Sequence, residues 1–454
     1  MRNAARIISQ WEWIFLLLLL PLFMFPEGAR GLVILIIPLL GFVRLLAGER
    51  LVPATPYNIA LLLLIVMLGI GLLTSYDLSL SGPKAAGFLV GVALLFATIE
   101  FSRRTSVWGV VAAFLAMGVM MAIVGLFGSI WASPFDFLNG MRALLPGESP
   151  AVPGAVGGMV NPNELAGVLG WVAPLAFACT IGMSRRLWRD NKFVVAALIV
   201  TTLLLSFVLV ATSSRGGILA LCTALVIVLA FFIPLRWRLV LIIGFVIGLL
   251  IVVSYGRALL QQDLVGDTLG LNGRLEIWAR ALLVIEDFPL TGVGLNAFRR
   301  VVQILYPLFE VSSDIDLAHA HNHLFQVALD LGLPGLVGYL ALWFISAGLL
   351  WSTAASLRKR GATRHPYYSL VAGLSGSLAA GWMFGLFDVV ALGSRPAFLW
   401  WLLLGMTASV HYAVRYSGEK LRHGHHFQIR LFRLNSRARS VGSSTLPASP
   451  KNKT

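Results

Sequence analysis

Two apolar runs decide the class of this protein, and they follow one another in KFVVAALIVTTLLLSFVLVATSSRGGILALCTALVIVLAFF, residues 192–232. Each run is long enough to cross roughly 30 Å of hydrocarbon as a helix. Their apolar residues are continuous rather than alternating, which indicates helices and not the strands of a barrel. A bilayer core offers no hydrogen-bond partners, so a spanning helix must satisfy its own backbone. The stretch therefore predicts two transmembrane helices that meet at a polar junction around Arg215.

The whole chain has the composition of a membrane protein. Of its 454 residues, 58% are hydrophobic and only 12% are charged, and the mean hydropathy is +0.85. A soluble domain could not hide so much apolar surface. We therefore predict an all-α, polytopic membrane fold with about twelve transmembrane helices. The predicted spans lie near 11–26, 31–47, 57–75, 84–101, 106–130, 163–183, 193–212, 216–235, 239–255, 331–351, 367–390 and 396–414.

The basic residues orient these spans. The chain holds 35 Lys and Arg against 20 Asp and Glu, which gives a formal net charge of +15. With the N-terminus in the cytoplasm, most basic residues fall on the cytoplasmic side, among them Arg103, Arg185 and the tail after Arg415. The charge therefore predicts topology and attraction to anionic lipid, and no nucleic-acid partner. No cleavage site of small residues follows the first span, so we expect it to be retained.

Two regions are expected, an integral membrane domain at 1–414 and a basic cytoplasmic tail at 415–454. The tail is polar and is expected to be disordered towards its end. A long outer loop, 256–330, separates spans nine and ten. Amphipathic helices predicted at 273–290 and 296–310 would form a small cap on the outer membrane face. The apolar stripe of the first is expected to comprise Leu275, Trp278, Leu282 and Ile285.

Five ionisable side chains converge on the outer face of this topology, where such groups are costly and tend to be functional. They are Glu164, Arg215, Arg274, His321 and Asp388. An Arg at a span end often only snorkels to lipid headgroups. At Arg215 the flanking hydroxyls, 212–214, and glycines, 216–217, favour an anion site that a ligand can approach closely. Glu164 and Asn163 open a span and can be helix caps instead.

Two of these groups have structural alternatives. Arg274 can pair with Asp267 or Glu276 rather than with a ligand. Asp388 can form an ion pair with Arg395. The sequence leaves both alternatives open.

Three interpretations of HAHNH, residues 319–323, are open: a metal site, a catalytic base and a solvated loop. Zinc takes at least three protein ligands, and Asp314 and Asp316 would have to supply oxygen atoms beside the histidines. A neutral imidazole, with a pKa of about 6.5, accepts a proton at neutral pH. We favour one histidine acting as a base or as the group that orients one.

Three motifs resemble segments of the O-antigen ligase/polymerase superfamily of bacterial membrane glycosyltransferases. They are SSRGG (213–217), GRLEIWARALLVIEDFPLTGVGLNAF (273–298) and HAHNHLFQVALDLGLPGLVGYL (319–340), with NPNELAG (161–167) as a weaker match. The third is the most specific, because the family carries His-Asn, nine residues, Gly, two residues and Gly. Here His321 and Asn322 are followed at that spacing by Gly332 and Gly335. Leu336 stands where ligases of the enteric type often have Thr.

The resemblance implies a metal-independent, inverting glycosyltransferase without a cofactor. It implies a multi-pass protein of the bacterial inner membrane with its active site facing the periplasm, and a fold like that of the integral-membrane (type C) glycosyltransferases. The donor would be a glycan on undecaprenyl diphosphate. In a ligase the acceptor would be a sugar hydroxyl of lipid A–core oligosaccharide, and in a polymerase it would be a second carrier-linked glycan.

The resemblance also assigns roles to residues. His321 maps to the family's essential histidine and would be the general base. Arg215 and Arg274 would bind the diphosphate, for which guanidinium forks are well suited. Asn322 would orient the histidine or cap the helix. The remaining candidates for orienting His321 or binding sugar hydroxyls are Asp388, Glu164 and Asn163.

Other functions share parts of this pattern. A repeat-unit polymerase carries the same motifs, and a protein O-oligosaccharyltransferase differs only in its acceptor. A transporter of lipid-linked glycans would perform no chemistry, but it predicts charges at the bilayer midplane and internal repeats. The spans hold few such charges and no repeat is visible, which disfavours a transporter. A ligase is the favoured interpretation, with a polymerase as the close alternative.

Overall fold

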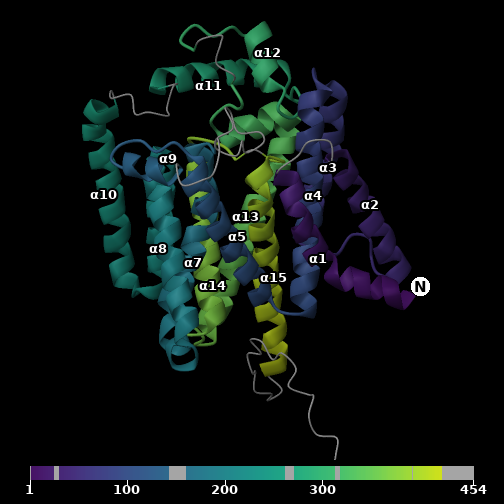
Figure 1. The fold of residues 1–454 in the computed structure, drawn as a ribbon, viewed down its shortest axis with the longest axis vertical. Helices are drawn as coiled ribbons and strands as arrows, with labels where there is room; N and C mark the ends of the chain where they lie inside the picture. The colour runs from purple at the N-terminus through teal and green to yellow at the C-terminus, as the bar shows by residue number, and fades with distance from the viewer. Residues whose placement is uncertain are drawn as a thin grey trace, which may run out of the picture. The chain divides into compact units, whose positions relative to one another are not determined.

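A computed structural model describes the chain over residues 2–24, 30–142, 160–260, 270–311, 317–390 and 392–421. Within these residues the protein is all-helical and contains no strand (Figure 1). Its long helices fall on the predicted spans. They are α1 (Arg2–Met24), α2 (Arg30–Ala47), α3 (Asn58–Thr74), α4 (Leu78–Arg104), α5 (Val107–Gly128), α7 (Pro162–Asp190), α8 (Lys192–Ala211), α9 (Arg215–Phe232), α10 (Leu235–Leu260), α13 (His323–Lys359), α14 (Pro366–Gly385) and α15 (Phe398–Leu421).

Seven helices in the described part of the chain are long and apolar enough to cross a membrane. They lie within α4, α5, α7, α8, α9, α13 and the stretch Arg395–Arg415, while Ile36–Ala47 and α3 are shorter apolar helices. The all-α, polytopic membrane class is therefore confirmed. The number of twelve spans stays a prediction.

The chain separates into two compact units, Met1–Val414 and Arg415–Thr454. In the second unit the structure describes only the last turns of α15, to Leu421. The predicted disordered part of the tail lies outside the described residues.

Helix α14 forms the centre of the first unit, and it packs against α7 and α9. Small residues make this close packing possible. A Cβ added to Gly373 would lie 2.7 Å from the Leu175 side chain, and one added to Gly376 would lie 2.6 Å from Val228. Glycines that let backbones approach are the usual device for packing helices in lipid, where the hydrophobic effect does not hold them together.

Large apolar side chains cover the outside of the bundle. Ile59 is 86% exposed, Leu73 is 89% exposed and Phe193 is 88% exposed. A water-soluble protein rarely exposes so many large apolar side chains, whereas lipid would cover them at no cost. The exposed residues thus support the membrane assignment independently of the sequence pattern.

Two short helices of the outer loop lie across one end of the bundle (Figure 1). They are α11 (Gly270–Asp287) and α12 (Phe298–Leu305), which confirm the two helices predicted there. With the loop that follows them they form a cap with its own core. That core includes Ile277, Ala281, Val284, Phe298, Val302, Leu317 and Ala320.

The predicted apolar stripe of the first cap helix was wrong in part. Trp278 and Ile285 pack against the cap core, but Leu275 and Leu282 are 51% and 47% exposed. The helix carries two neighbouring apolar stripes, and the cap packs on the one that includes Ile277. Hydrophobic spacing alone does not distinguish stripes that lie one residue apart.

Helix α13 is broken near its start by Gly332, whose φ of 68° and ψ of 178° are not helical. A Cβ at this position would lie 2.4 Å from the Leu290 carbonyl oxygen. The Val293 and Leu333 amides bond across the break to the Leu329 and Pro289 carbonyls, at 2.7 Å each. Only glycine tolerates this conformation and this close approach, which explains the first glycine of the motif physically.

Candidate active site

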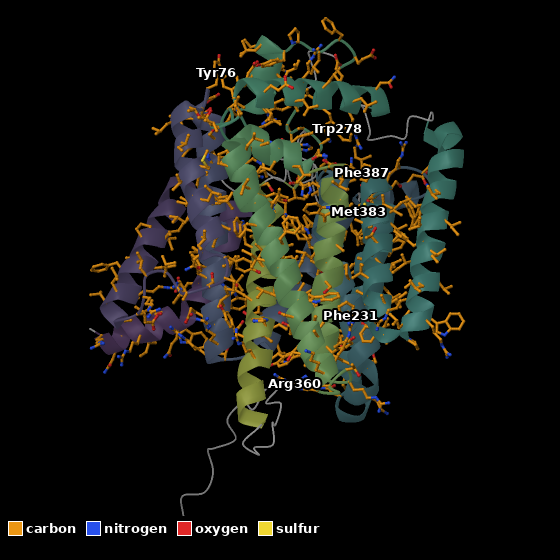
Figure 2. The ribbon with its side chains drawn as sticks, turned by 180° about the vertical axis from the view of Figure 1, so that it is seen from behind. Tyr76, Phe231, Trp278, Arg360, Met383 and Phe387 are labelled. Carbon is orange, nitrogen blue, oxygen red and sulfur yellow. The ribbon has the colours of Figure 1, made fainter. Side chains whose placement is uncertain are left out.

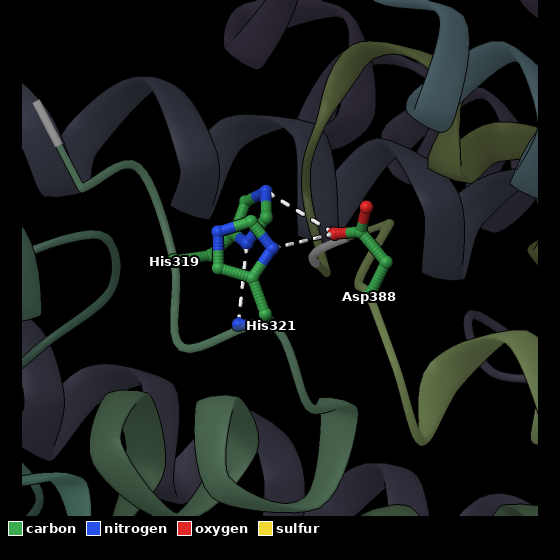
Figure 3. Close-up of side chains that lie close together, drawn as sticks. All are labelled: His319, His321 and Asp388. Atoms are coloured by element: carbon green, nitrogen blue, oxygen red, sulfur yellow. Dashed lines mark hydrogen bonds and ion pairs between the residues drawn. The ribbon is translucent and has the colours of Figure 1, made fainter. Parts of the chain in front are cut away.

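Two histidines and an aspartate meet at the capped end of the bundle (Figure 3). His321 Nδ1 lies 3.3 Å from Asp388 Oδ1, and His319 Nε2 lies 3.6 Å from the same oxygen. The histidines precede α13, whereas Asp388 follows α14. We predicted a span to residue 390, but α14 ends at Gly385, so Asp388 lies in the loop beyond it. The cluster thus joins two loops that are distant in sequence.

Asn322 fixes the loop that carries His321. It is the N-cap of α13, and its side chain accepts the Leu324 and Phe325 amides at 2.9 and 3.3 Å. Its Nδ2 donates to the Leu386 carbonyl at 3.3 Å, which ties the histidine loop to the loop of Asp388. The predicted helix-capping role is therefore confirmed, and the second bond positions the two loops relative to each other.

The backbone of His321 is held in the left-handed region, at a φ of 51°. Bulky residues adopt this conformation only where the surroundings enforce it. Two side chains do so at the neighbouring Ala320. Its amide donates to Gln326 Oε1 at 2.8 Å, and its carbonyl accepts Trp278 Nε1 of the cap at 3.0 Å. The cap therefore contributes directly to the placement of His321.

Asp388 and His319 differ in protonation at neutral pH. Burial alone would raise the pKa of Asp388, but the neighbouring imidazoles of His321 and His319 outweigh it and lower that pKa to about 2. Burial lowers the pKa of His319 to about 4, although the carboxylate of Asp388 opposes this shift. At neutral pH Asp388 is therefore an anion and His319 is neutral.

Hydrogen bonding also assigns the tautomer of His319. The His321 amide donates to His319 Nδ1 at 3.3 Å, so this nitrogen carries no proton. In a neutral ring the proton must then sit on Nε2, the atom that faces Asp388. His319 thus presents an N–H group to the carboxylate, alongside His321.

His323 belongs to a different environment. It is buried, its Nδ1 lies 3.0 Å from the Tyr339 hydroxyl, and its ring packs against Trp343 and Trp382. A Cβ at Gly385 would lie 2.6 Å from this ring, so α14 is adapted to it. His323 is therefore part of the packing between α13 and α14 and not of the Asp388 cluster.

We expect His323→Ala to destabilise the protein by roughly 2–4 kcal/mol, because it leaves a cavity among aromatic rings. Thermal unfolding of the purified protein in detergent measures this effect. His319→Ala is the matched control and should lower the unfolding temperature much less, because its side chain is 23% exposed. Equal unfolding temperatures for the wild type and His323→Ala would contradict the packing role.

Arg215 is the first residue of α9 and is exposed. A Cβ added to the neighbouring Gly216 would lie 3.4 Å from Phe387 Cβ. Arg215 therefore begins its helix next to the loop that carries Asp388. Figure 2 shows Phe387 at the same end of the bundle as Trp278, with Arg360 at the opposite end.

The expected role of the residues around Arg215 in ligand approach was wrong in part. Ser214 is the N-cap of α9, and its hydroxyl accepts the Gly217 amide at 3.2 Å. A Cβ at Gly217 would lie 2.6 Å from Ala166 Cβ, so this glycine serves helix packing. The cap and the packing fix where α9 begins and hence where Arg215 lies.

Arg274 lies in the second turn of α11, one helical turn before Trp278. Residues four apart share a helix face, so Arg274 points to the side on which Trp278 contacts the histidine loop. Glu276 accepts the Phe309 and Glu310 amides at 2.6 and 2.8 Å, which makes it a tether for the cap. The other expected partner, Asp267, lies outside the described residues, as do Asp314 and Asp316.

Glu164 and Asn163 lie in the first turn of α7. The cap of this helix is Asn161, whose Oδ1 accepts the Asn163 amide at 2.8 Å. The expectation that Asn163 or Glu164 is the cap was therefore wrong.

Glu164 lies within electrostatic range of Asp388 and of Lys84, a residue of α4 that the sequence analysis did not identify. The sequence signal that could have identified Lys84 is a single Lys at the start of an apolar span.

Comparison with known proteins finds similarity to O-antigen ligases over the region that carries these motifs. The family model "O-Antigen ligase" matches residues 200–340, a segment that contains Arg215, Arg274 and His321. An O-antigen ligase of Pseudomonas aeruginosa PAO1 is 27% identical over 220 residues, which cover 47% of this chain and 51% of that relative. The match thus spans about half the length of the relative. Both findings support the O-antigen ligase/polymerase superfamily.

Proposed function

We propose that this chain of the O-antigen ligase/polymerase superfamily transfers a glycan from undecaprenyl diphosphate to a sugar hydroxyl of lipid A–core oligosaccharide. The reaction takes place on the periplasmic face of the bacterial inner membrane. The observation that carries the proposal is the cluster of His321 and an anionic Asp388 at the capped end of the bundle. Arg215 at the start of α9 and Arg274 on the cap helix supply positive charge from two further elements.

The geometry suits proton abstraction by His321. Its Nδ1 faces Asp388, which leaves Nε2 to take the proton of the attacking hydroxyl. The hydroxyl oxygen then bonds to the anomeric carbon while the bond from that carbon to the diphosphate oxygen breaks, which inverts the carbon. Asp388 stabilises the imidazolium that forms, and the arginines stabilise the charge that develops on the diphosphate.

A metal-assisted reaction is the main chemical alternative. Single donor atoms of His319, His321 and Asp388 lie within 4.8 Å of one another, close enough to hold an ion. The hydrogen bond from the His321 amide to His319 Nδ1 argues against this. A metal on Nε2 would require the His319 ring to lose its last proton or to give up that bond. We therefore propose that the cluster holds protons rather than a metal.

Deletion of the gene in its host tests the proposed function. We expect surface glycolipids on a gel to show bare lipid A–core, and long glycan chains to accumulate on the lipid carrier. Complementation with the wild-type gene should restore the ladder. Core with a single repeat unit would identify a polymerase instead, and a normal ladder would contradict both functions or reveal a redundant enzyme.

A further inference from the structure

A second group of positive charges lines a cavity of about 280 Å³ between α4, the segment before α12 and the loop before η3. Lys84 of α4, Arg299 of α12 and Arg395 of the 3-10 helix η3 (Arg395–Ala397) line it, and none of the described carboxylates does. Gly393 and Ser394 of the lining follow Asp388 in the loop between α14 and η3. The cavity and the Asp388 cluster therefore share one loop, and Lys84 and Arg299 act electrostatically on His319.

Close backbone contacts build the wall of this cavity. Gly393 has a φ of 75°, and a Cβ there would lie 1.9 Å from the Lys84 carbonyl oxygen. The loop before η3 therefore lies directly on α4 and fixes Arg395 relative to Lys84. On the other side, Ser81 of α4 donates to the Leu295 carbonyl at 2.6 Å, which fixes the segment that leads to α12 and Arg299.

The lining suits a phosphate group. No described carboxylate lies within 4.0 Å of the Lys84 nitrogen, although Glu164 and Asp330 act on it from farther away. Ser394 also lines the cavity, and its buried Oγ has no hydrogen-bond partner among the described residues. A cavity with three cations and an unsatisfied hydroxyl favours an anion that accepts several hydrogen bonds.

We propose that this cavity binds a phosphate group of the acceptor glycolipid. The inference rests on the proposed function, in which two glycolipids must reach His321 together. Arg215 and Arg274 come from α9 and α11, whereas Lys84, Arg299 and Arg395 come from α4, α12 and η3. Two separate cationic groups beside one base fit two anionic substrates, with the donor diphosphate on the first and the acceptor phosphate on the second.

Binding to the inactive His321→Ala protein in lipid nanodiscs tests this proposal without turnover. The probe is rough lipopolysaccharide, which consists of lipid A and core, before and after chemical removal of its phosphates. We expect Arg299→Gln to raise the dissociation constant of the phosphorylated probe about tenfold, as the loss of one charge-assisted contact would. Removal of the phosphates should weaken binding of the probe to the parent protein, which keeps Arg299, by a similar factor. With the dephosphorylated probe, the parent and the Arg299→Gln protein should bind almost equally.

Arg300→Gln is the matched control, because Arg300 is the next residue of α12 but is exposed and does not line the cavity. It should bind the phosphorylated probe as the parent protein does. An equal affinity of the Arg299→Gln protein and its parent would overturn the proposal. So would an effect of Arg299→Gln that persists unchanged after the phosphates are removed.

A second probe, the glycan repeat unit on undecaprenyl diphosphate, distinguishes the source of the phosphate. If it binds once and that binding depends on Arg299, the cavity holds the donor and the proposal is wrong. If it binds twice and only one site depends on Arg299, the acceptor phosphate belongs to a second carrier, which supports the cavity but replaces the ligase by a polymerase. Because binding needs no transfer, a failure of the proposed function is seen separately, as a wild-type protein that binds both probes but does not join them.

Discussion

We expect the His321→Ala protein to transfer glycan at least about a thousandfold more slowly than the wild type while it remains folded. General base catalysis contributes roughly 10²–10⁴-fold to a rate. The substitution also removes the ion-pair partner of Asp388, which lies 3.3 Å from His321 Nδ1. The initial rate of transfer by the purified protein in nanodiscs, with donor and acceptor supplied, measures the effect. The unfolding temperature should stay near that of the wild type, since His321 lies in a loop outside the cores of the bundle and the cap.

His319→Ala is the informative comparison for that variant. His319 touches the same oxygen of Asp388 at 3.6 Å, so its loss should lower the rate by about tenfold, through the position of Asp388 and not through the proton transfer itself. His321 would keep its contact with the carboxylate. A loss as large as that of His321→Ala, together with inactivation of the wild type by a chelator, would show that the cluster is a metal site.

Arg215→Lys should lower the transfer rate about a hundredfold, although it preserves the charge. A guanidinium can hold two phosphate oxygens at once, whereas an ammonium acts as a point charge. The loss should be larger for transfer than for donor binding, because the charge on the diphosphate grows as the glycosidic bond breaks. Rates and donor dissociation constants of the same preparations separate the two effects.

Arg236→Lys serves as the control for this substitution. Arg236 is an exposed residue of α10, and it follows the end of α9 opposite to Arg215. The Arg236→Lys protein should transfer glycan at the wild-type rate. Wild-type activity in the Arg215→Lys protein would argue against a bidentate contact between Arg215 and the diphosphate.

The helices and the main candidate residues could be predicted from the sequence because each rests on a local signal. Apolar runs indicate helices that lipid can accept, and the structure has a helix at every predicted span. The resemblance singled out His321, Asn322 and Gly332 as parts of one motif, and the structure explains two of these residues. Asn322 caps α13, and Gly332 breaks it where the Leu290 carbonyl comes close.

The side-chain arrangement could not be predicted, because it depends on how distant loops meet. Asp388 and His321 lie on opposite sides of α13 and α14 in the sequence, and only folding brings them within 3.3 Å. The cavity beside them needs Lys84, Arg299 and Arg395 from three elements, and no spacing in the sequence connects these. Likewise, three histidines in one short segment look equivalent, yet His323 faces a buried aromatic cluster while its neighbours face Asp388.

The most direct test of the proposed function is a reconstituted reaction. Purified wild-type protein, treated with a chelator, is supplied with the glycan on undecaprenyl diphosphate and with lipid A–core, and the linkage formed is determined by NMR spectroscopy. We predict glycan joined to the core with an inverted anomeric carbon, and one undecaprenyl diphosphate released for each bond formed. A retained configuration, glycan joined only to a second carrier-linked glycan, or no product under these conditions would contradict the account.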